Sequence, residues 1–296
     1  MSREKISVII PAFNAGKYIN KCIKSIFMQS FTDWKIILVN DGSTDNTLEI
    51  VNTFSQSKII VLNQSNRGVS EARNKGFLAS QSKYVVFFDS DDMMSPDFLE
   101  SRYIFLENKP ELCYCCSDVF KFANSPDEII YIYKGCANNV IPEILLYSPE
   151  HATVPSNYMF KRETLIDYKL LFNPLLSSTA DKLFLLELNE FSKGEYFHGS
   201  PLLYWARSDS MSNRLTSALI SDNEQFYYLL QMNNFIPKKL KREAHFYKYS
   251  ILAFSHLKIK KIKGLQYLLI GLIKYPDYFI IKMSKRILYR FKSSKK

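Results

Sequence analysis

The sequence predicts an α/β protein whose sheet is mostly parallel and flanked by helices. Its first hundred residues alternate short apolar runs, typical of buried strands, with segments whose apolar residues recur every three or four positions, typical of helices. The composition agrees, because 47% hydrophobic residues with only 9 Gly and 11 Pro are typical of a folded globular chain. Strand and helix in alternation indicate a doubly wound parallel sheet.

The predicted elements follow in a regular order through residue 88. Strands are expected at residues 6–11, 35–40, 58–62 and 84–88, and helices at 15–28, 48–54 and 69–79. Beyond residue 110 the pattern is more mixed, with short strands expected at 112–116 and 129–133. From residue 220 it becomes helical, with a linker near 234–239. We therefore predict one domain over residues 1–219 and a helical, basic extension over 220–296.

Polar motifs follow the predicted strands, at the sheet edge where parallel α/β folds bind ligands. The first strand ends in Pro11 and is followed by Phe13 and Asn14, a stiff turn that leaves backbone groups free for a ligand or simply ends the strand. The second is followed by Asp41 and Gly42. Asp41 either accepts hydrogen bonds from a nucleoside or belongs to a tight turn ahead of a helix.

Two further motifs carry charge. Arg73 lies about one helical turn beyond Gly68, where its planar guanidinium suits a phosphate or carboxylate, although a solvated helix face is an equal alternative. Asp89, Asp91 and Asp92 directly follow an apolar strand. Carboxylates this close repel one another unless a cation lies among them, and Mg²⁺ or Mn²⁺ prefers such oxygen ligands. The alternative is an acidic turn before the next helix.

In order and spacing, these four motifs resemble the family-two inverting glycosyltransferases, which have the GT-A fold. The resemblance extends over about residues 5–97 and more weakly to about 213. It implies that residues 1–100 form a nucleotide-binding half and 101–219 an acceptor half. The implied roles are as follows: Pro11 and Phe13 line the nucleotide pocket, Asp41 binds the base (usually uracil) with Arg73 nearby, Asp89 contacts the ribose, and Asp91 binds the divalent cation, Mn²⁺ or Mg²⁺.

The family also implies a catalytic base and a closing loop further along the chain. The base is usually the Asp of a Glu-Asp pair, and the matching position here is Asp181, preceded by Ala180 in place of the first acid. Asp181 is otherwise the N-terminal acid of an ordinary helix. The segment 204–212 resembles the loop over the diphosphate, with Arg207 as the phosphate contact, although the His often found there is missing.

These residues suggest a single displacement at the anomeric carbon. Asp181 would act as general base on an acceptor hydroxyl, and the cation with Arg207 would stabilise the departing diphosphate. No second carboxylate is indicated on the opposite face of the sugar, so inversion is favoured over double displacement. We expect a UDP-sugar donor and a glycan or lipid-linked oligosaccharide acceptor in cell-surface polysaccharide synthesis.

The positive charge is concentrated at the C-terminus. Residues 257–296 hold twelve Lys and Arg against one Asp, while the whole chain has a net charge of +10. Apolar residues recur every three or four positions over 259–273 and again over 279–291. Basic amphipathic helices of this kind bind anionic bilayers. We therefore expect docking on an anionic membrane surface; packing of the apolar faces against the body of the protein is the alternative.

The remaining features restrict the location and the class of protein. The five Cys residues are odd in number and no signal peptide is recognisable, so we expect a cytoplasmic protein, peripheral on the inner face of the cell membrane. A dehydrogenase and a P-loop nucleotidase are excluded, because GxGxxG and GxxxxGK[ST] are absent. The basic tail on a near-neutral body does not indicate nucleic-acid binding. A non-catalytic relative that binds nucleotides or serves as a scaffold remains the alternative, because of Ala180.

Overall fold

The computed structural model describes residues 4–137, 140–145, 148, 150–206, 216–258 and 262–277. They belong to two compact units: Met1–Ile144 with Ser148–Ser210, and Leu145–Tyr147 with Met211–Lys296.

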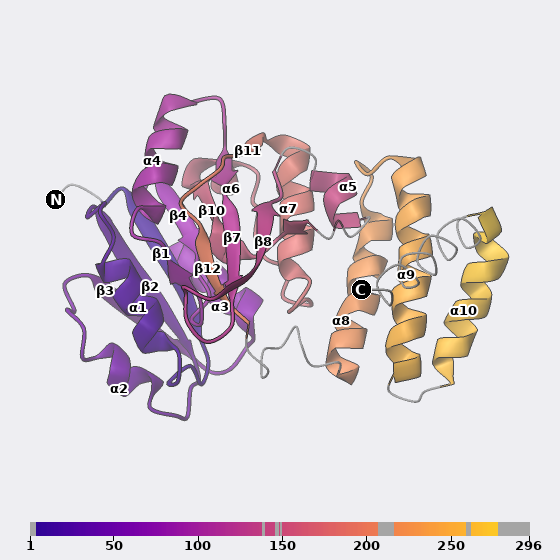
Figure 1. Cartoon of the computed structure of the whole chain (residues 1–296), viewed down its shortest axis with the longest axis horizontal. Helices are drawn as coiled ribbons and strands as arrows, with labels where there is room; N and C mark the ends of the chain where they lie inside the picture. The colour runs from indigo at the N-terminus through magenta and orange to yellow at the C-terminus, as the bar shows by residue number, and fades with distance from the viewer. Residues whose placement is uncertain are drawn as a thin grey trace. The chain divides into compact units, whose positions relative to one another are not determined.

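A seven-stranded sheet forms the centre of the first unit (Figure 1), in the order β11-β6-β10-β4-β1-β2-β3. Its strands are β1 (Ile6–Ala12), β2 (Trp34–Asp41), β3 (Ile59–Gln64), β4 (Tyr84–Phe87), β6 (Tyr114–Cys116), β10 (Tyr158–Lys161) and β11 (Gly194–Tyr196). Strands β1 to β4 pair in parallel, as predicted. Strand β10 runs antiparallel to both β4 and β6. Consequently its N-terminal end lies at the edge where the parallel strands have their carboxyl ends.

Eight helical segments of the first unit accompany this sheet in the part of the chain that the structure describes. They are α1 (Ile19–Phe27), α2 (Thr47–Val51), α3 (Val69–Ala79), α4 (Phe98–Asn108), α5 (Val140–Leu145), the 3-10 helix η1 (Pro155–Asn157), α6 (Arg162–Asp167) and α7 (Ala180–Phe191). Helix α3 has its predicted bounds. Helix α1 begins at Ile19, later than predicted, because residues 15–18 form a turn in which the Tyr18 N–H donates to the Ala15 carbonyl oxygen (2.8 Å).

A second sheet of five short strands was not predicted apart from its strand near 129–133. Its order is β5-β12-β7-β8-β9. The strands are β5 (Met93–Met94), β12 (Leu202–Trp205), β7 (Asp118–Phe122), β8 (Ile129–Gly135) and β9 (His151–Ala152). Two of them have only two residues, which is too short for an alternating pattern to be recognised in the sequence.

The fully buried Arg102 of α4 ties distant segments of the first unit together. Its guanidinium donates to Ser117 Oγ (2.7 Å), to Asn157 Oδ1 (2.7 Å) and to the Ser200 carbonyl oxygen (3.0 Å). Burial lowers the pKa of Arg102 to about 10, so the side chain stays a cation at neutral pH. A buried cation of this kind is tolerated because neutral oxygens solvate it in place of water.

The second unit is helical over its described residues. Helices α8 (Ser217–Met232), α9 (Lys238–Lys258) and α10 (Lys263–Lys274) lie side by side (Figure 1), with α9 in contact with both others. The Glu224 carboxylate of α8 accepts hydrogen bonds from Lys263 Nζ (2.9 Å) and the Tyr267 hydroxyl, and lies 3.4 Å from His256 Nε2. One acid therefore joins all three helices. The predicted second tail helix, at 279–291, lies outside the described residues.

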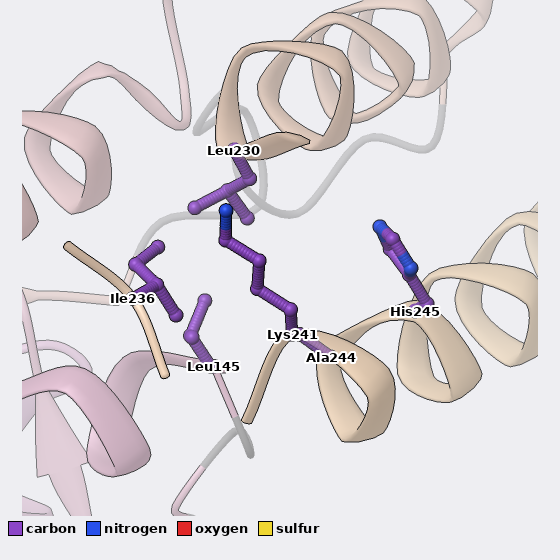
Figure 2. A pocket seen from close by; sticks show the side chains of 6 residues that line it. All are labelled: Leu145, Leu230, Ile236, Lys241, Ala244 and His245. Atoms are coloured by element: carbon purple, nitrogen blue, oxygen red, sulfur yellow. The ribbon is translucent and has the colours of Figure 1, made fainter. Parts of the chain in front are cut away.

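Figure 2 shows a small hollow in this unit, lined by Leu145, Leu230, Ile236, Lys241, Ala244 and His245. The side chains of Leu145, Leu230 and Ile236 lie around the Lys241 side chain. His245 is partly removed from water at this hollow, and its burial lowers its pKa. The hollow is a gap in helix packing and contains none of the predicted site residues. Among the helices of the described residues, none combines the length and the hydropathy of a membrane span.

Candidate functional site

Asp41 ends β2 at the carboxyl edge of the sheet and is buried. Its Oδ1 accepts from Gln64 Nε2 (2.8 Å) and the Arg67 N–H (2.8 Å), and its Oδ2 accepts from the Gly68 N–H (2.9 Å). Gly42 makes the predicted tight turn, with φ of 76° and a neighbour, the Asn66 nitrogen, 2.9 Å from where a Cβ would lie. The Asp41 carboxylate thus fixes the segment that leads into α3.

Arg73 of α3 points inward and is only 5% exposed, so the alternative of a solvated helix face is wrong. Its Nη2 lies 2.5 Å from Asp89 Oδ1, and its guanidinium lies 5.0 Å from the centroid of the Phe172 ring. Among the residues that the structure describes, its Nε has no hydrogen-bond partner. A buried guanidinium with unused donor capacity at this edge is suited to a further anionic or carbonyl oxygen.

The acidic cluster follows β4, as the sequence predicted. The Asp89 N–H donates to Ser156 Oγ (2.9 Å), Asp89 and Asp91 are half-buried, and Asp92 is buried. Burial raises the pKa of the neighbouring Cys22 thiol, and the charges of Asp92, Asp91 and Asp89 raise it further. All three acids therefore contribute to one region of negative potential.

The donor atoms of this cluster fit a hard divalent cation. Within the described residues, no group of three or more His, Cys, Asp or Glu forms a ready-made metal site. Mg²⁺ needs no such group, because it binds through one or two carboxylates together with the phosphates of its substrate. Asp91, which is half-buried, is the carboxylate that the family resemblance nominates for this cation.

Asp181 lies in the first turn of α7. Its Oδ2 accepts from the Thr153 hydroxyl (2.8 Å), and a small hollow beside it is lined by Thr153, Pro155, Tyr158, Phe160, Phe172, Phe184 and Leu185. Removal from water raises the pKa of Asp181, while Lys182, the Thr153 hydroxyl and Arg73 act in the opposite direction. The charge of Arg73 therefore reaches both Asp89 and Asp181, although these two acids are far apart in the sequence.

The other predicted residues are placed differently. Pro11 is buried within β1, in register with Val39, whereas Phe13 follows the strand and is exposed. Arg207 lies outside the described residues. Trp205, the last residue of β12, contacts Tyr18 edge-on (ring centroids 5.8 Å apart) and stacks on Phe122 (6.0 Å).

Sequence reasoning missed two residues that hold the site together, Thr153 and Ser156. Both precede β10, whereas a parallel sheet is expected to bind its ligand with residues that follow its strands. Since β10 is antiparallel, its N-terminal side meets the same edge as the carboxyl ends of the parallel strands. The only sequence signal was the pair of hydroxyl residues around Pro155.

Comparison with known proteins identifies relatives of this chain. The family model described as Glycosyl transferase family 2 matches residues 7–168, more than half of the 296 residues. An uncharacterized glycosyltransferase YibD of Escherichia coli is 39% identical over 120 residues, 40% of this chain and 35% of YibD. The chondroitin synthase of Pasteurella multocida is 34% identical over 111 residues, 36% of this chain and 12% of the synthase. The match therefore spans about a third or less of these relatives' length.

Solved structures with a similar fold cover most of the chain. S. aureus TarS 1-349 in complex with UDP-GlcNAc superimposes with a TM-score of 0.71 at 19% identity, covering 90% of this chain and 79% of TarS 1-349. A mannosyltransferase of Pyrobaculum calidifontis in complex with GDP-Man and Mn²⁺ gives a TM-score of 0.60 at 14% identity, covering 92% and 81%. At these identities the similarity shows the fold, which confirms the predicted GT-A architecture.

Proposed function

Since the chain belongs to glycosyl transferase family 2, we propose that it transfers a sugar, with inversion, from a UDP-sugar to a glycan or lipid-linked oligosaccharide in cell-surface polysaccharide synthesis. The main support for this proposal is the position of Arg73. Its guanidinium pairs with Asp89, and its positive charge also acts on the pKa of Asp181. Residues nominated for donor binding and for catalysis thereby share one edge of the sheet. The UDP-GlcNAc complex of TarS supports a nucleotide-sugar donor by analogy of fold.

In the proposed mechanism, Asp181 removes the proton from an acceptor hydroxyl as that oxygen attacks the anomeric carbon, and the bond from this carbon to the diphosphate breaks, so that the nucleoside diphosphate leaves. A general base works best when its pKa is near the working pH, and the raised pKa of Asp181 is a shift in that direction. Asp89 and Arg73 orient the donor at the sheet edge, Phe13 contributes an exposed aromatic face beside it, and Arg207 contacts the phosphates. Asp91 would hold Mn²⁺ or Mg²⁺, which supplies positive charge next to the diphosphate.

The proposal extends to the organisation of the whole chain. We assign donor and acceptor binding to residues 1–219 and a separate role to the extension over 220–296. The concentration of positive charge in residues 257–296 supports a cytoplasmic enzyme that sits peripherally on the inner face of the cell membrane. Such a position suits an acceptor carried on a lipid.

A panel of UDP-, GDP- and dTDP-sugars with Mn²⁺ tests the donor. The matching donor stabilises the protein by mass action, about 2.7 kcal/mol when present at 100 times its Kd. With that donor, Asp181→Asn should lower transfer by about 10²- to 10⁴-fold while donor stabilisation persists. Asp167→Asn, a change of the same kind at an exposed position, is the matched control. Full transfer by Asp181→Asn removes this residue from the mechanism, and no stabilisation by any sugar nucleotide contradicts the donor assignment.

A further inference from the structure

Helix α10 packs on α9 through its glycines. Gly264 and Gly271 are the buried residues of α10. A Cβ on Gly264 would lie 2.8 Å from the Ala253 carbonyl oxygen, and one on Gly271 would lie 3.1 Å from Tyr249 Cβ. These two glycines are seven residues apart, which places them on the same face of a helix. The face that contacts α9 therefore contains the smallest side chains of α10.

Tyr267 of α10 also stacks on His256 of α9 (ring centroids 5.4 Å apart), but several large apolar side chains of α10 and its N-cap, Ile262, are exposed. Ile262, Leu265, Leu269 and Ile273 recur at helical spacing and are 77%, 52%, 57% and 78% exposed. We call these four residues the apolar stripe. In a soluble helix that serves only to complete a bundle, the apolar face is turned inward. Here four large apolar side chains are turned outward instead, so the stripe offers an apolar surface to a partner.

Basic residues border the stripe. Lys263 and Lys274 lie at the two ends of α10, and both are exposed. Glu224 holds Lys263 at 2.9 Å and also binds Tyr267, which fixes the rotation of α10 about its axis. The surrounding sequence, 257–296, contains twelve basic residues and one acidic residue.

We infer that the apolar stripe of α10 is the surface by which this chain enters the headgroup region of an anionic bilayer, with the helix lying in the plane of the membrane. An exposed apolar face with basic borders is the form of an interfacial helix. Charge complementarity favours anionic lipid over a second copy of this chain, because two copies would bring the same basic segments together. The inference rests on the proposed membrane role and names the face that performs it.

Vesicle flotation of the full-length protein tests the inference, with phosphatidylcholine vesicles that either contain or lack phosphatidylglycerol. Wild-type protein should float with the anionic vesicles, and less so at high salt. Leu269→Glu should reduce the bound-to-free ratio by about tenfold or more, because one leucine loses its apolar burial. Met232→Glu, on an exposed residue of α8, is the matched control and should float like wild type. Circular dichroism verifies that both variants are folded.

The outcomes separate this inference from the proposed function. If wild-type protein floats with neither vesicle, the membrane role and the stripe assignment both fail, while sugar transfer is judged by the donor assay. If wild type floats and Leu269→Glu floats equally, only the stripe assignment fails. If light scattering shows a wild-type dimer that Leu269→Glu dissociates, without loss of flotation, the stripe binds a second copy and the inference is wrong.

Discussion

The pKa of Asp181, the proposed general base, is subject to opposing influences. Removal from water raises its pKa, whereas Lys182, the Thr153 hydroxyl and Arg73 favour the ionised form. Thr153 is neutral and donates directly to Oδ2 at 2.8 Å. It can therefore both hold the carboxylate in one orientation and limit the rise in pKa without adding charge to the site.

Thr153→Val should move the acid limb of kcat/KM to higher pH. The substitution removes the hydrogen bond that stabilises the carboxylate, so the pKa of Asp181 rises and the base becomes protonated at a higher pH than in wild type. Thr153→Ser keeps the hydroxyl and should restore the wild-type limb. The measurement is a pH profile of transfer at subsaturating donor. An unchanged limb in Thr153→Val would show that Thr153 has only a packing role.

At the scale of elements, α3 connects the two ends of the site. Its N-terminal Gly68 donates to Asp41, and its next turn carries Arg73 to Asp89. The helix lies close to the sheet at Gly76, where a Cβ would be 2.4 Å from Ile9 Cγ2. The close approach of the Gly76 backbone to Ile9 thus sets the distance between α3 and the sheet, and with it the distance from the Arg73 guanidinium to the strand ends.

Gly76→Ala should lower both stability and donor binding. Since Ile9 lies in the centre of β1 and cannot move aside freely, the added methyl forces α3 outward at a cost of about 1–3 kcal/mol. Thermal unfolding with and without the donor measures both effects. Leu78→Ala, an exposed site on the same helix, is the control. Normal donor stabilisation in Gly76→Ala would show that the depth of α3 does not position Arg73.

The strength of the sequence pattern in each element decides which parts of the fold and of the candidate site could be predicted. Strands buried on both faces have strong patterns, so the parallel half of the sheet and the positions of Asp41 and Asp89 at its edge were predictable. The inward direction of Arg73 was not predictable, because polar residues of α3 such as Ser70 and Asn74 are buried with it and the helix has no clear apolar face. The antiparallel direction of β10 relative to β4 was not predictable either, because strand direction depends on pairing between distant segments and leaves no local sequence pattern. The contact of Thr153 with Asp181 depends on that direction. The roles assigned to the candidate site residues stay predictions: Pro11, Phe13, Asp41, Arg73, Asp89, Asp91, Asp181 and Arg207.

At the scale of the whole molecule, the predicted chemistry and the proposed membrane contact belong to different units. The described candidate site residues lie in the first unit, and α10 lies in the second. In the second unit Glu224 contacts α9 and α10 from α8. A change at Glu224 is therefore expected to disturb the orientation of the apolar stripe.

Glu224→Gln should loosen the second unit and leave the site intact. A neutral amide removes the negative charge, so Lys263 loses its ion pair and the bond from the Tyr267 hydroxyl becomes an ordinary neutral one, about half as strong. Hydrogen exchange should speed up in α8, α9 and α10, while donor stabilisation equals that of wild type. Faster exchange around Arg73 and Asp181 as well would mean that the two units are coupled.

The division of the chain between the units has a practical consequence for genetic dissection. Leu145–Tyr147 belongs to the second unit although the segments on either side belong to the first. Buried Leu145 lies in the hollow with Leu230 and Ile236. A stop codon after residue 210 therefore leaves this leucine in place but deprives it of its neighbours. The truncated protein would then expose an apolar side chain that is buried in the full-length chain, and this could alter its binding to vesicles. Single-residue changes on α10 therefore test membrane binding more cleanly than truncation does.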